Sequence, residues 1–209
     1  IVSAIVGIRG LTIVFTGEQN HAGTTTMARR RDAATALFDM ASRINEQFPN
    51  IANDRTVWTI GNVLIEPGAA SIIPGRAELT LQFRDQDEEI LDQLENIVGF
   101  IATDINAKGI VKVEIEPARA PIIPSKMSAR FRAEMQKSAE LIVPNKWRHM
   151  PSAAGHDPMV INEKLPCGML FIPSINGVSH NFQEDSYDDD IILGCQVLAD
   201  AAASILKQA

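Results

Sequence analysis

The sequence predicts an α/β fold in which amphipathic helices alternate with strands. Over residues 77–83 apolar side chains alternate with polar ones, which is typical of a half-buried strand. In the stretches 27–48 and 87–107 apolar residues recur at intervals of three and four, as in helices with one buried face. The chain is 45% hydrophobic and 22% charged, which are ordinary values for a globular protein and exclude a disordered chain, a collagen and a coiled coil.

The first half of the chain supplies four predicted strands and two predicted helices. In chain order these are strand 11–16, helix 27–48, strand 56–65, strand 77–83, helix 87–107 and strand 111–115. Strand 11–16 is rich in β-forming residues, and strand 111–115 alternates apolar with charged side chains. Pro-Gly turns at 67–68 and 74–75 separate the second strand from the third. The apolar face of the first helix consists of Ala33, Ala36, Leu37, Met40, Ala41 and Ile44.

The boundaries of this first half have local signals. Asp87 or its neighbours place negative charge at the start of the second helix, where the helix dipole favours it, and Gly109 ends that helix. The strand–helix–strand–strand–helix–strand order over about residues 8–118 is that of the split βαβ, ferredoxin-like unit. Pro117, Pro121 and Pro124 then punctuate the chain and indicate a domain boundary.

The second half of the chain has a different pattern. A helix is expected over 128–141, a short strand over 146–150, an apolar strand over 169–172 and a helix over 187–207. Helices alternating with apolar strands indicate part of an α/β layer with a parallel sheet. Even with a strand at 1–6, these are too few strands for a complete α/β domain, so further strands are expected upstream of Ile1. We therefore interpret the 209 residues as a fragment.

Charge and cysteine content narrow the function classes. The net charge of −7 and the absence of a Lys/Arg block argue against nucleic-acid binding. No apolar run reaches the roughly 18 residues of a membrane helix, so no membrane contact is expected. Cys167 and Cys195 fit no zinc or redox spacing, and as reduced thiols they fit a cytoplasmic protein. The chain starts at Ile1, so a missing signal peptide says nothing about export.

Three of the four histidines lie in polar, turn-like segments, which often hold functional groups. These are His21, His156 and His180, whereas His149 is interpreted as structural. His180 follows the predicted strand 169–172 and is the best candidate metal ligand, because open α/β sheets bind ligands at the carboxyl ends of their strands. A catalytic zinc needs about three protein ligands, and the pair His156-Asp157 could supply a further ligand or a carboxylate behind one.

Other polar residues have two open interpretations. Arg84 ends the alternating strand, where it could clasp a carboxylate through two parallel hydrogen bonds or be an ordinary surface arginine. The run Arg29-Arg30-Arg31 is typical of a solvated helix face, and Asp32 could pair with one of these arginines. Neither a GxSxG nucleophile elbow nor a glycine-rich phosphate loop occurs.

Three segments together resemble a known family. They are residues 20–27 with 30–33 (NHAGTTTM and RRDA), residues 152–157 (SAAGHD) and residues 171–181 (FIPSINGVSHN). Their order and separation are similar to those of the zinc-dependent N-carbamoyl-amino-acid amidohydrolases, allantoate amidohydrolases and β-ureidopropionases. These enzymes belong to the aminoacylase and carboxypeptidase-like dinuclear metallopeptidases. The resemblance covers essentially the whole chain.

The resemblance implies an organisation and a set of roles. Residues 7–120 would be a lid and dimerisation domain, and residues 1–6 and 121–209 the C-terminal part of a zinc-peptidase-type α/β catalytic domain. His180 matches the last metal ligand, and His21 the lid histidine that stabilises the tetrahedral intermediate. Arg84 matches the arginine that holds the substrate carboxylate. Further substrate-binding positions are Asn20, Ser71 and Gly155. Two divalent ions, zinc or manganese, are implied, with most of their ligands upstream of residue 1.

The sequence also departs from the family pattern. Ser71 stands where the family has asparagine, Thr26 replaces proline, and Ala153 replaces glycine. Phe182-Gln183-Glu184 replaces Pro-Ala-Glu after the third motif. Ser71 and Ala153 belong to the implied pocket, so they bear on the identity of the substrate more than on the class of reaction.

The leading hypothesis is a metal-dependent hydrolase of linear ureido or carbamoyl C–N bonds in small carboxylates such as N-carbamoyl amino acids or allantoate. A homodimer formed through the lid would let a second subunit contribute His21. One alternative is an aminoacylase or exopeptidase on the same scaffold. The other, if the chain is naturally this short, is a non-catalytic dimerisation or binding module.

Overall fold

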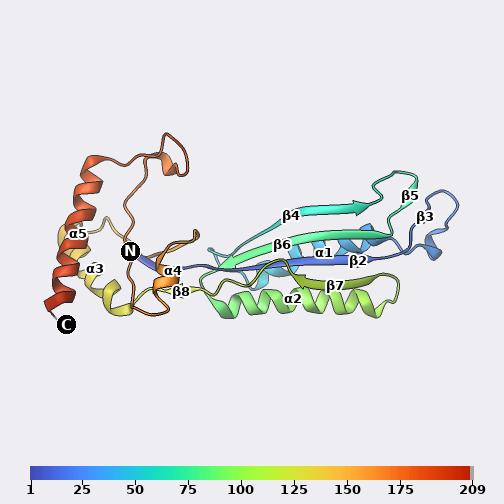
Figure 1. Ribbon diagram of the computed structural model, residues 1–209, viewed down its shortest axis with the longest axis horizontal. Helices are drawn as coiled ribbons and strands as arrows, with labels where there is room; N and C mark the ends of the chain where they lie inside the picture. Colours follow the sequence, from blue (N-terminus) through green and yellow to red (C-terminus); the bar gives the residue numbers. More distant parts are fainter. Residues whose placement is uncertain (208–209) are drawn as a thin grey trace. The chain divides into compact units, whose positions relative to one another are not determined.

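The computed structural model describes residues 1–207, which form a mixed α/β protein of two compact units (Figure 1). One unit is Gly7–Pro124, and the other combines Ile1–Val6 with the chain from Ser125 onward. Within residues 1–207, no helix is both long enough and apolar enough to cross a membrane.

A four-stranded antiparallel sheet forms the centre of the unit Gly7–Pro124 (Figure 1). Its strands lie in the order β4-β6-β2-β7, with bounds Val57–Glu66, Arg76–Asp85, Gly7–Thr16 and Lys112–Pro117. The alternation predicted for 77–83 is confirmed along the whole of β6, where odd-numbered side chains are buried and even-numbered ones are half-buried. The sheet therefore has one core face and one open face.

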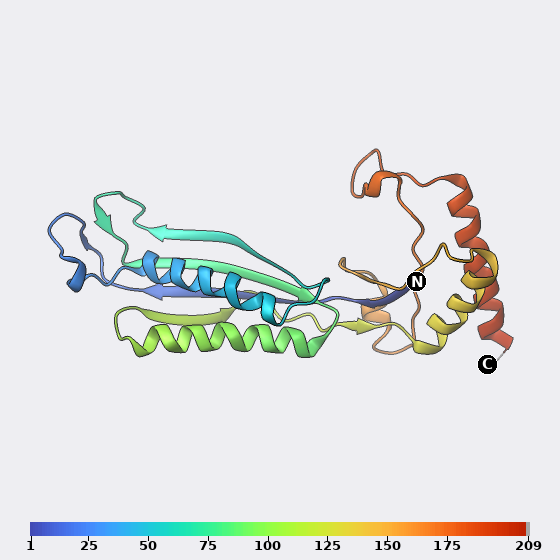
Figure 2. The ribbon, with the colours of Figure 1, turned by 180° about the vertical axis from the view of Figure 1, so that it is seen from behind.

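Helices α1 (Ala33–Gln47) and α2 (Glu88–Ala107) cover the core face of this sheet (Figure 2). Phe15, Phe48 and Phe83 are fully buried between the sheet and the helices. Burying a side chain of this size contributes roughly 1.5–3 kcal/mol, so the helices are held mainly by packing. Even-numbered β6 side chains remain on the other face, where they can meet a ligand.

The first helix begins later than its periodicity predicts. Met27–Arg29 form one 3₁₀ turn, and α1 starts only at Ala33. The cause is Asp32, whose carboxylate accepts hydrogen bonds from the backbone N–H groups of Ala34 (2.9 Å) and Thr35 (3.2 Å). Asp32 is thus the N-cap of α1. The arginine pairing considered for Asp32 is replaced by this capping.

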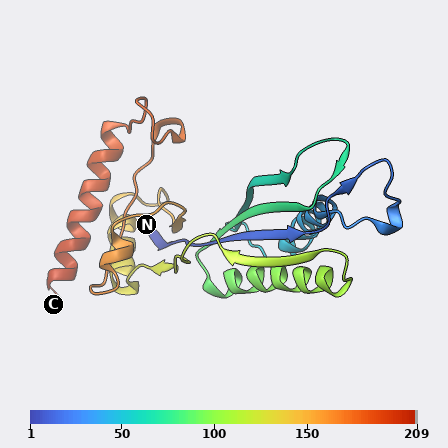
Figure 3. The same cartoon turned by 45° about the vertical axis from the view of Figure 1, so that its right-hand side comes forward.

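The second unit contains a three-stranded mixed sheet and a helix pair. The strand order is β8 (Ser125–Lys126), β1 (Val2–Ile5), β9 (Met150–Ser152), with β8 antiparallel and β9 parallel to β1. Helices α3 (Ala129–Ile142) and α5 (Asp188–Lys207) pack side by side (Figure 3), and a short α4 spans Pro158–Ile161. Their shared apolar residues include Met135, Ala139 and Val197.

Two strand predictions in this unit are wrong: one strand lies at other residues, and the other does not form among the described residues. The strand expected over 146–150 begins at Met150 and ends at Ser152. The stretch 169–172 forms no strand ladder in the described part of the chain, although the Met169 carbonyl accepts a hydrogen bond from the Val2 N–H (3.0 Å). Its Ile172 side chain instead packs on α5, at the point where Gly194 leaves room for it. The stretch therefore contacts a helix instead of pairing as a strand, and Phe171 and Ile172 stay partly exposed.

Candidate active site

Three of the predicted site residues lie together at one end of the four-stranded sheet. The two-residue strands β3 (Asn20–His21) and β5 (Ile72–Ile73) pair antiparallel, with His21 opposite Ile72. The N–H of Ala22 then donates to the carbonyl of Ser71 (2.9 Å). This ribbon projects beyond the ends of β2 and β6 (Figure 1). It brings Asn20, His21 and Ser71 into one exposed cluster.

The local backbone determines how the His21 ring is held. Its Nδ1 accepts hydrogen bonds from the N–H groups of Gly23 (3.0 Å) and Thr24 (3.2 Å). A ring nitrogen that accepts carries no proton, so these donors assign the neutral tautomer with its proton on Nε2. His21 is exposed, and its Nε2–H is therefore suited to donate to a developing oxyanion.

Close approach of the ring to the backbone explains a glycine in this turn. A Cβ added at Gly23 would lie 3.2 Å from Cε1 of His21 and 3.5 Å from its Nδ1. Arg30 closes the same turn, since its guanidinium donates to the carbonyls of Thr25 (3.2 Å) and Ala22. The sequence interpretation missed this function of Arg30 because the arginine run was assigned to a helix face.

Arg84 lies far from this cluster although it belongs to the same sheet. It pairs with Ile8 at one end of β6, whereas Arg76 pairs with Thr16 at the other end. Eight residues of strand separate the two ends, which is about 26 Å. Arg84 is half-buried on the open face, and its Nε and Nη2 both donate to Oε1 of Gln82 (3.0 and 2.8 Å).

The residue after Arg84 anchors this end of the strand. Asp85 is fully buried and accepts hydrogen bonds from Thr56 Oγ1 (2.6 Å), Asn53 Nδ2 (3.2 Å) and the N–H of Asp87 (2.8 Å). These bonds satisfy a carboxylate that would otherwise be costly to bury. Sequence reasoning missed both Asp85 and Gln82. For Gln82, the signal was its place two residues before Arg84, on the same side of the strand.

The histidine of the second motif contacts its own unit. Nε2 of His156 lies 2.7 Å from Oγ of buried Ser152, and its ring packs on Phe171 with centroids 5.5 Å apart. These contacts hold the loop that carries Gly155, which is exposed. An added Cβ at Gly155 would come no closer than 3.9 Å, to Met159 Sδ, so sterics do not require a glycine there.

His180 lies in a loop rather than at the end of a strand, because the strand expected over 169–172 is absent. The loop closes on itself: the Ile175 N–H donates to Asp185 O (2.8 Å), and Ser186 Oγ donates to Pro173 O (2.8 Å). His180 is exposed, has a left-handed backbone (φ 55°), and donates its N–H to Oε2 of Glu184 (2.7 Å). A non-glycine residue rarely adopts this conformation.

The predicted metal ligands are not gathered into one site in the described part of the chain. Among residues 1–207, no three His, Cys, Asp or Glu side chains converge as a metal ion would require. The other predicted source of a ligand was the pair His156-Asp157, and Nε2 of His156 lies 2.7 Å from Oγ of Ser152. A catalytic zinc needs about three protein ligands.

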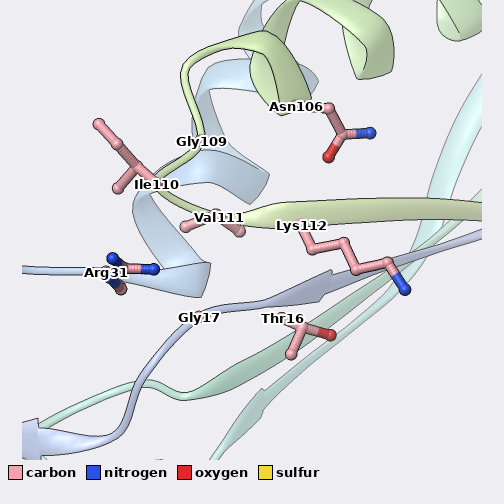
Figure 4. Close-up of a pocket in the computed structure, with 8 residues that line it drawn as sticks. All are labelled: Thr16, Gly17, Arg31, Asn106, Gly109, Ile110, Val111 and Lys112. Atoms are coloured by element: carbon pink, nitrogen blue, oxygen red, sulfur yellow. The ribbon is translucent and has the colours of Figure 1, made fainter.

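Two hollows lie at the end of the sheet that carries the β3–β5 ribbon. The smaller, about 250 Å³, lies between Arg31 and Lys112, whose side chains are on opposite sides of it (Figure 4). The larger, about 510 Å³, is lined by Glu18, Asn20, Thr25, Met27, Ala28, Arg29, Arg30, Arg31, Gly109 and Ile110. Asn20 is thus a predicted site residue that lines a hollow.

The unit Gly7–Pro124 thus carries a histidine held as a hydrogen-bond donor and a half-buried arginine, the kinds of side chain that can stabilise negative charge and bind a carboxylate. Residues 8–204 match the Peptidase family M20/M25/M40, and the chain belongs to this family. The family resemblance seen in the three sequence motifs is thereby confirmed. Enzymes of this family generally depend on two metal ions.

Similar proteins have amidohydrolase names. The allantoate amidohydrolase of Escherichia coli K12 is 32% identical over 203 residues, which cover 95% of this chain and 48% of that protein. The N-carbamoyl-L-amino-acid amidohydrolase of Paenarthrobacter aurescens is 31% identical over 202 residues, covering 95% and 47%. The chain therefore spans about half the length of the curated relatives it matches.

A solved structure is similar over the same extent. The crystal structure of an amidase of the hydantoinase/carbamoylase family from Burkholderia phymatum superposes with a TM-score of 0.86 at 40% identity. The match covers 98% of this chain and 49% of that chain.

Proposed function

We propose that the protein hydrolyses linear ureido or carbamoyl C–N bonds in small carboxylates such as N-carbamoyl amino acids or allantoate. The proposal is supported by family membership and by the names of the relatives that cover nearly all of this chain. The observation that carries it is the state of His21. Its Nδ1 accepts two backbone N–H groups, so its Nε2–H faces outward as a donor.

His21 would act as a hydrogen-bond donor and not as a base. Attack on the ureido carbonyl makes its oxygen negative, and a fixed donor stabilises that charge without reorganising. Arg84 would hold the substrate carboxylate, for which a guanidinium is suited by charge and by its paired N–H groups. Asn20 and Ser71 are placed beside His21 and would contact the substrate there. Gly155 is proposed as a residue of the pocket wall.

The unit Gly7–Pro124 is proposed to be a ferredoxin-like lid that also dimerises, with the lid covering about residues 7–120. Support comes from its strand order and from β4, an edge strand with exposed Val57, Val63 and Leu64. An exposed apolar edge strand is a template for pairing with another chain. A homodimer would also account for the distance between His21 and Arg84, because one site could take His21 from one subunit and Arg84 from the other.

Two divalent ions, zinc or manganese, are proposed as cofactors because of the family, with His180 as one ligand. When bound, such ions lower the pKa of water and polarise a carbonyl. Residues 1–6 and 121–209 would be the C-terminal part of the catalytic domain. We keep the cytoplasm as the proposed compartment, since Cys167 and Cys195 are both free thiols.

An aminoacylase or exopeptidase activity is the second candidate, because the matched family is a peptidase family. The two are separated by assaying N-carbamoyl amino acids, allantoate, N-acetyl amino acids and dipeptides side by side with the metal-loaded protein. The proposal expects the ureido substrates to be preferred. Preference for dipeptides or N-acetyl amino acids contradicts it, and turnover of none of them supports a non-catalytic module.

The role of His21 is tested with His21→Ala, using His149→Ala as the matched control. His149 is exposed and bonds Gln136 (3.1 Å) in the other unit. Loss of an oxyanion donor typically lowers kcat by roughly 10²–10³-fold. A loss of less than about tenfold in kcat/KM would rule out the donor role.

A further inference from the structure

The surroundings of Arg84 on the open face of the sheet suggest how its guanidinium is oriented. Arg84 lies between Ile8 on β2 and Val57 on β4, its direct partners in register. Directly opposed residues on antiparallel strands have Cβ atoms about 4.5–5.5 Å apart, so aliphatic carbon borders the arginine on two sides. Such neighbours limit hydration of the charge but offer no hydrogen bond that would set its direction.

Gln82 supplies that direction. It precedes Arg84 by two residues on β6, so both side chains leave the same face of the strand about 6.6 Å apart. Its Oε1 accepts from Nε and from Nη2 of Arg84, at 3.0 and 2.8 Å. Both donors of the side-on edge converge on one oxygen, so this edge of the guanidinium is directed toward Gln82.

The strand next to Gln82 places a glycine opposite it. Its register partner on β2 is Gly10, and the side chains of Ala118 and Arg119 pack over that glycine, each 3.6 Å from where a Cβ would lie. On the residue after Arg84, the buried carboxylate of Asp85 accepts hydrogen bonds from the side chains of Asn53 and Thr56 and from the backbone N–H of Asp87. Both the root and the tip of the Arg84 side chain are therefore constrained.

The acceptor is also neutral, and this matters for binding an anion. A carboxylate at position 82 could orient the arginine equally well, but it would add a negative charge beside the site of a negative ligand. An amide oxygen orients through its dipole and adds no net charge. A guanidinium held in one orientation also loses less rotamer entropy when it binds a carboxylate.

We propose that Gln82 is the positioning residue that presents Arg84 to the carboxylate of the substrate. The inference rests on the proposed function only in taking a carboxylate as the ligand of Arg84. Gln82 touches the arginine and not the reacting atoms, so its loss affects binding of the acidic group and leaves the chemical step nearly unchanged.

The experiment compares Gln82→Ala and Gln82→Glu with Thr80→Ala in the complete, metal-loaded protein. Thr80 lies on the same strand and the same face, one side-chain repeat further from Arg84, and is likewise half-buried. For an N-carbamoyl amino acid, Gln82→Ala should raise KM roughly tenfold with kcat within about twofold. For the matching N-carbamoyl amino-acid amide, which lacks the carboxylate, KM should not change. Thr80→Ala should alter neither.

Gln82→Glu separates orientation from charge. It keeps an oxygen acceptor for Arg84 but adds a negative charge, so KM for the carboxylate should rise, and the rise should shrink as added salt screens the repulsion. An unchanged KM in Gln82→Ala, or an equal rise for the carboxylate and the amide, would overturn the proposal.

A crystal structure of Gln82→Ala tests the same proposal without activity. The Arg84 guanidinium should lose its single orientation in Gln82→Ala and keep it in Thr80→Ala. If the parent protein hydrolyses no ureido carboxylate, the proposed function fails, while this structural result still decides whether Gln82 orients Arg84. An unchanged guanidinium in Gln82→Ala contradicts the inference.

Discussion

His21 and Arg84 lie at opposite ends of one antiparallel sheet. Arg84 pairs with Ile8 where β2 begins, and His21 follows the far end of β2 on the β3–β5 ribbon. The length of β6 between Arg84 and its far end is by itself about 26 Å, whereas a substrate of two-residue length spans about 7 Å. The sheet is a packed, hydrogen-bonded element, so bending within one unit cannot bring both residues onto one small molecule.

Together with the proposed homodimer, this separation predicts that two inactive variants complement each other. His21→Ala and Arg84→Ala should each lose nearly all activity as homodimers. When the two are co-expressed and mix randomly, half of the dimers are mixed, and each mixed dimer has one site with both residues intact. Activity on an N-carbamoyl amino acid should therefore return to about one quarter of the parent value.

The complementation has a built-in control. A chain carrying both substitutions, mixed with the Arg84→Ala chain, should restore nothing, because no site then contains both residues. If both residues served the same site from one chain, the mixture of single variants would also stay inactive, and the shared-site proposal would be wrong.

The close packing of His21 on its turn predicts that adding a methyl group at Gly23 lowers activity. In Gly23→Ala the new Cβ would lie 3.2 Å from Cε1 of His21, so the ring must shift by a few tenths of an ångström from the position in which Gly23 and Thr24 hold it. We expect kcat/KM to fall by roughly tenfold or more, since small misplacements of catalytic groups are costly. Steady-state kinetics measures the loss.

A matched substitution distinguishes ring displacement from general damage. Gly61→Ala changes a glycine that has nothing within 4 Å of the added Cβ. It should leave kcat/KM near the parent value. Equal losses in both variants would contradict the steric explanation.

Burial of Asp85 predicts a large loss of stability on truncation. In Asp85→Ala, Thr56, Asn53 and the N–H of Asp87 lose their acceptor at a fully buried position. We expect the free energy of unfolding to fall by roughly 2–4 kcal/mol, measured by urea titration. Asp54→Ala, at an exposed position, should change it by less than about 0.5 kcal/mol. A loss as small as that of the control would mean that the buried network contributes little.

The ion pair between Arg43 on α1 and Asp104 on α2 predicts a pH-dependent contribution to the stability of the fold. Nη1 of Arg43 donates to Oδ2 of Asp104 (2.7 Å), and this bond, helped by the charge of Lys108, lowers the pKa of Asp104. A lowered pKa in the folded state stabilises the fold above the ordinary value of about 4. That stabilisation is lost as the pH falls through the lowered pKa.

Melting temperatures across the acidic range test this contribution. Asp104→Asn should melt slightly below the parent at neutral pH, and the difference should disappear at the acidic end. Arg43→Met should give the same pattern, and the double variant should add little to either single one. A difference that grows on acidification has the wrong sign for this mechanism.

Much of the fold follows from local patterns in the sequence. The alternation of apolar and polar residues over 77–83 predicts β6. The recurrence of apolar residues at intervals of three and four predicts most of α1 and α2. These patterns are predictive because each element must bury one face. The pattern misleads at 169–172, where no strand forms in the described chain: Ile172 is exposed and contacts α5 at Gly194.

The sequence by itself determined the family motifs, the order of the main strands and helices of the unit Gly7–Pro124, and the candidate residues His21, Arg84 and His180. Tertiary structure alone decided their geometry. The pairing of β3 with β5 joins His21 to Ser71, fifty positions away, while the register of β6 with β2 separates both from Arg84. The physical reason is that periodicity encodes which face of an element is buried, whereas strand register between distant segments is fixed only by hydrogen bonding and packing of the whole sheet.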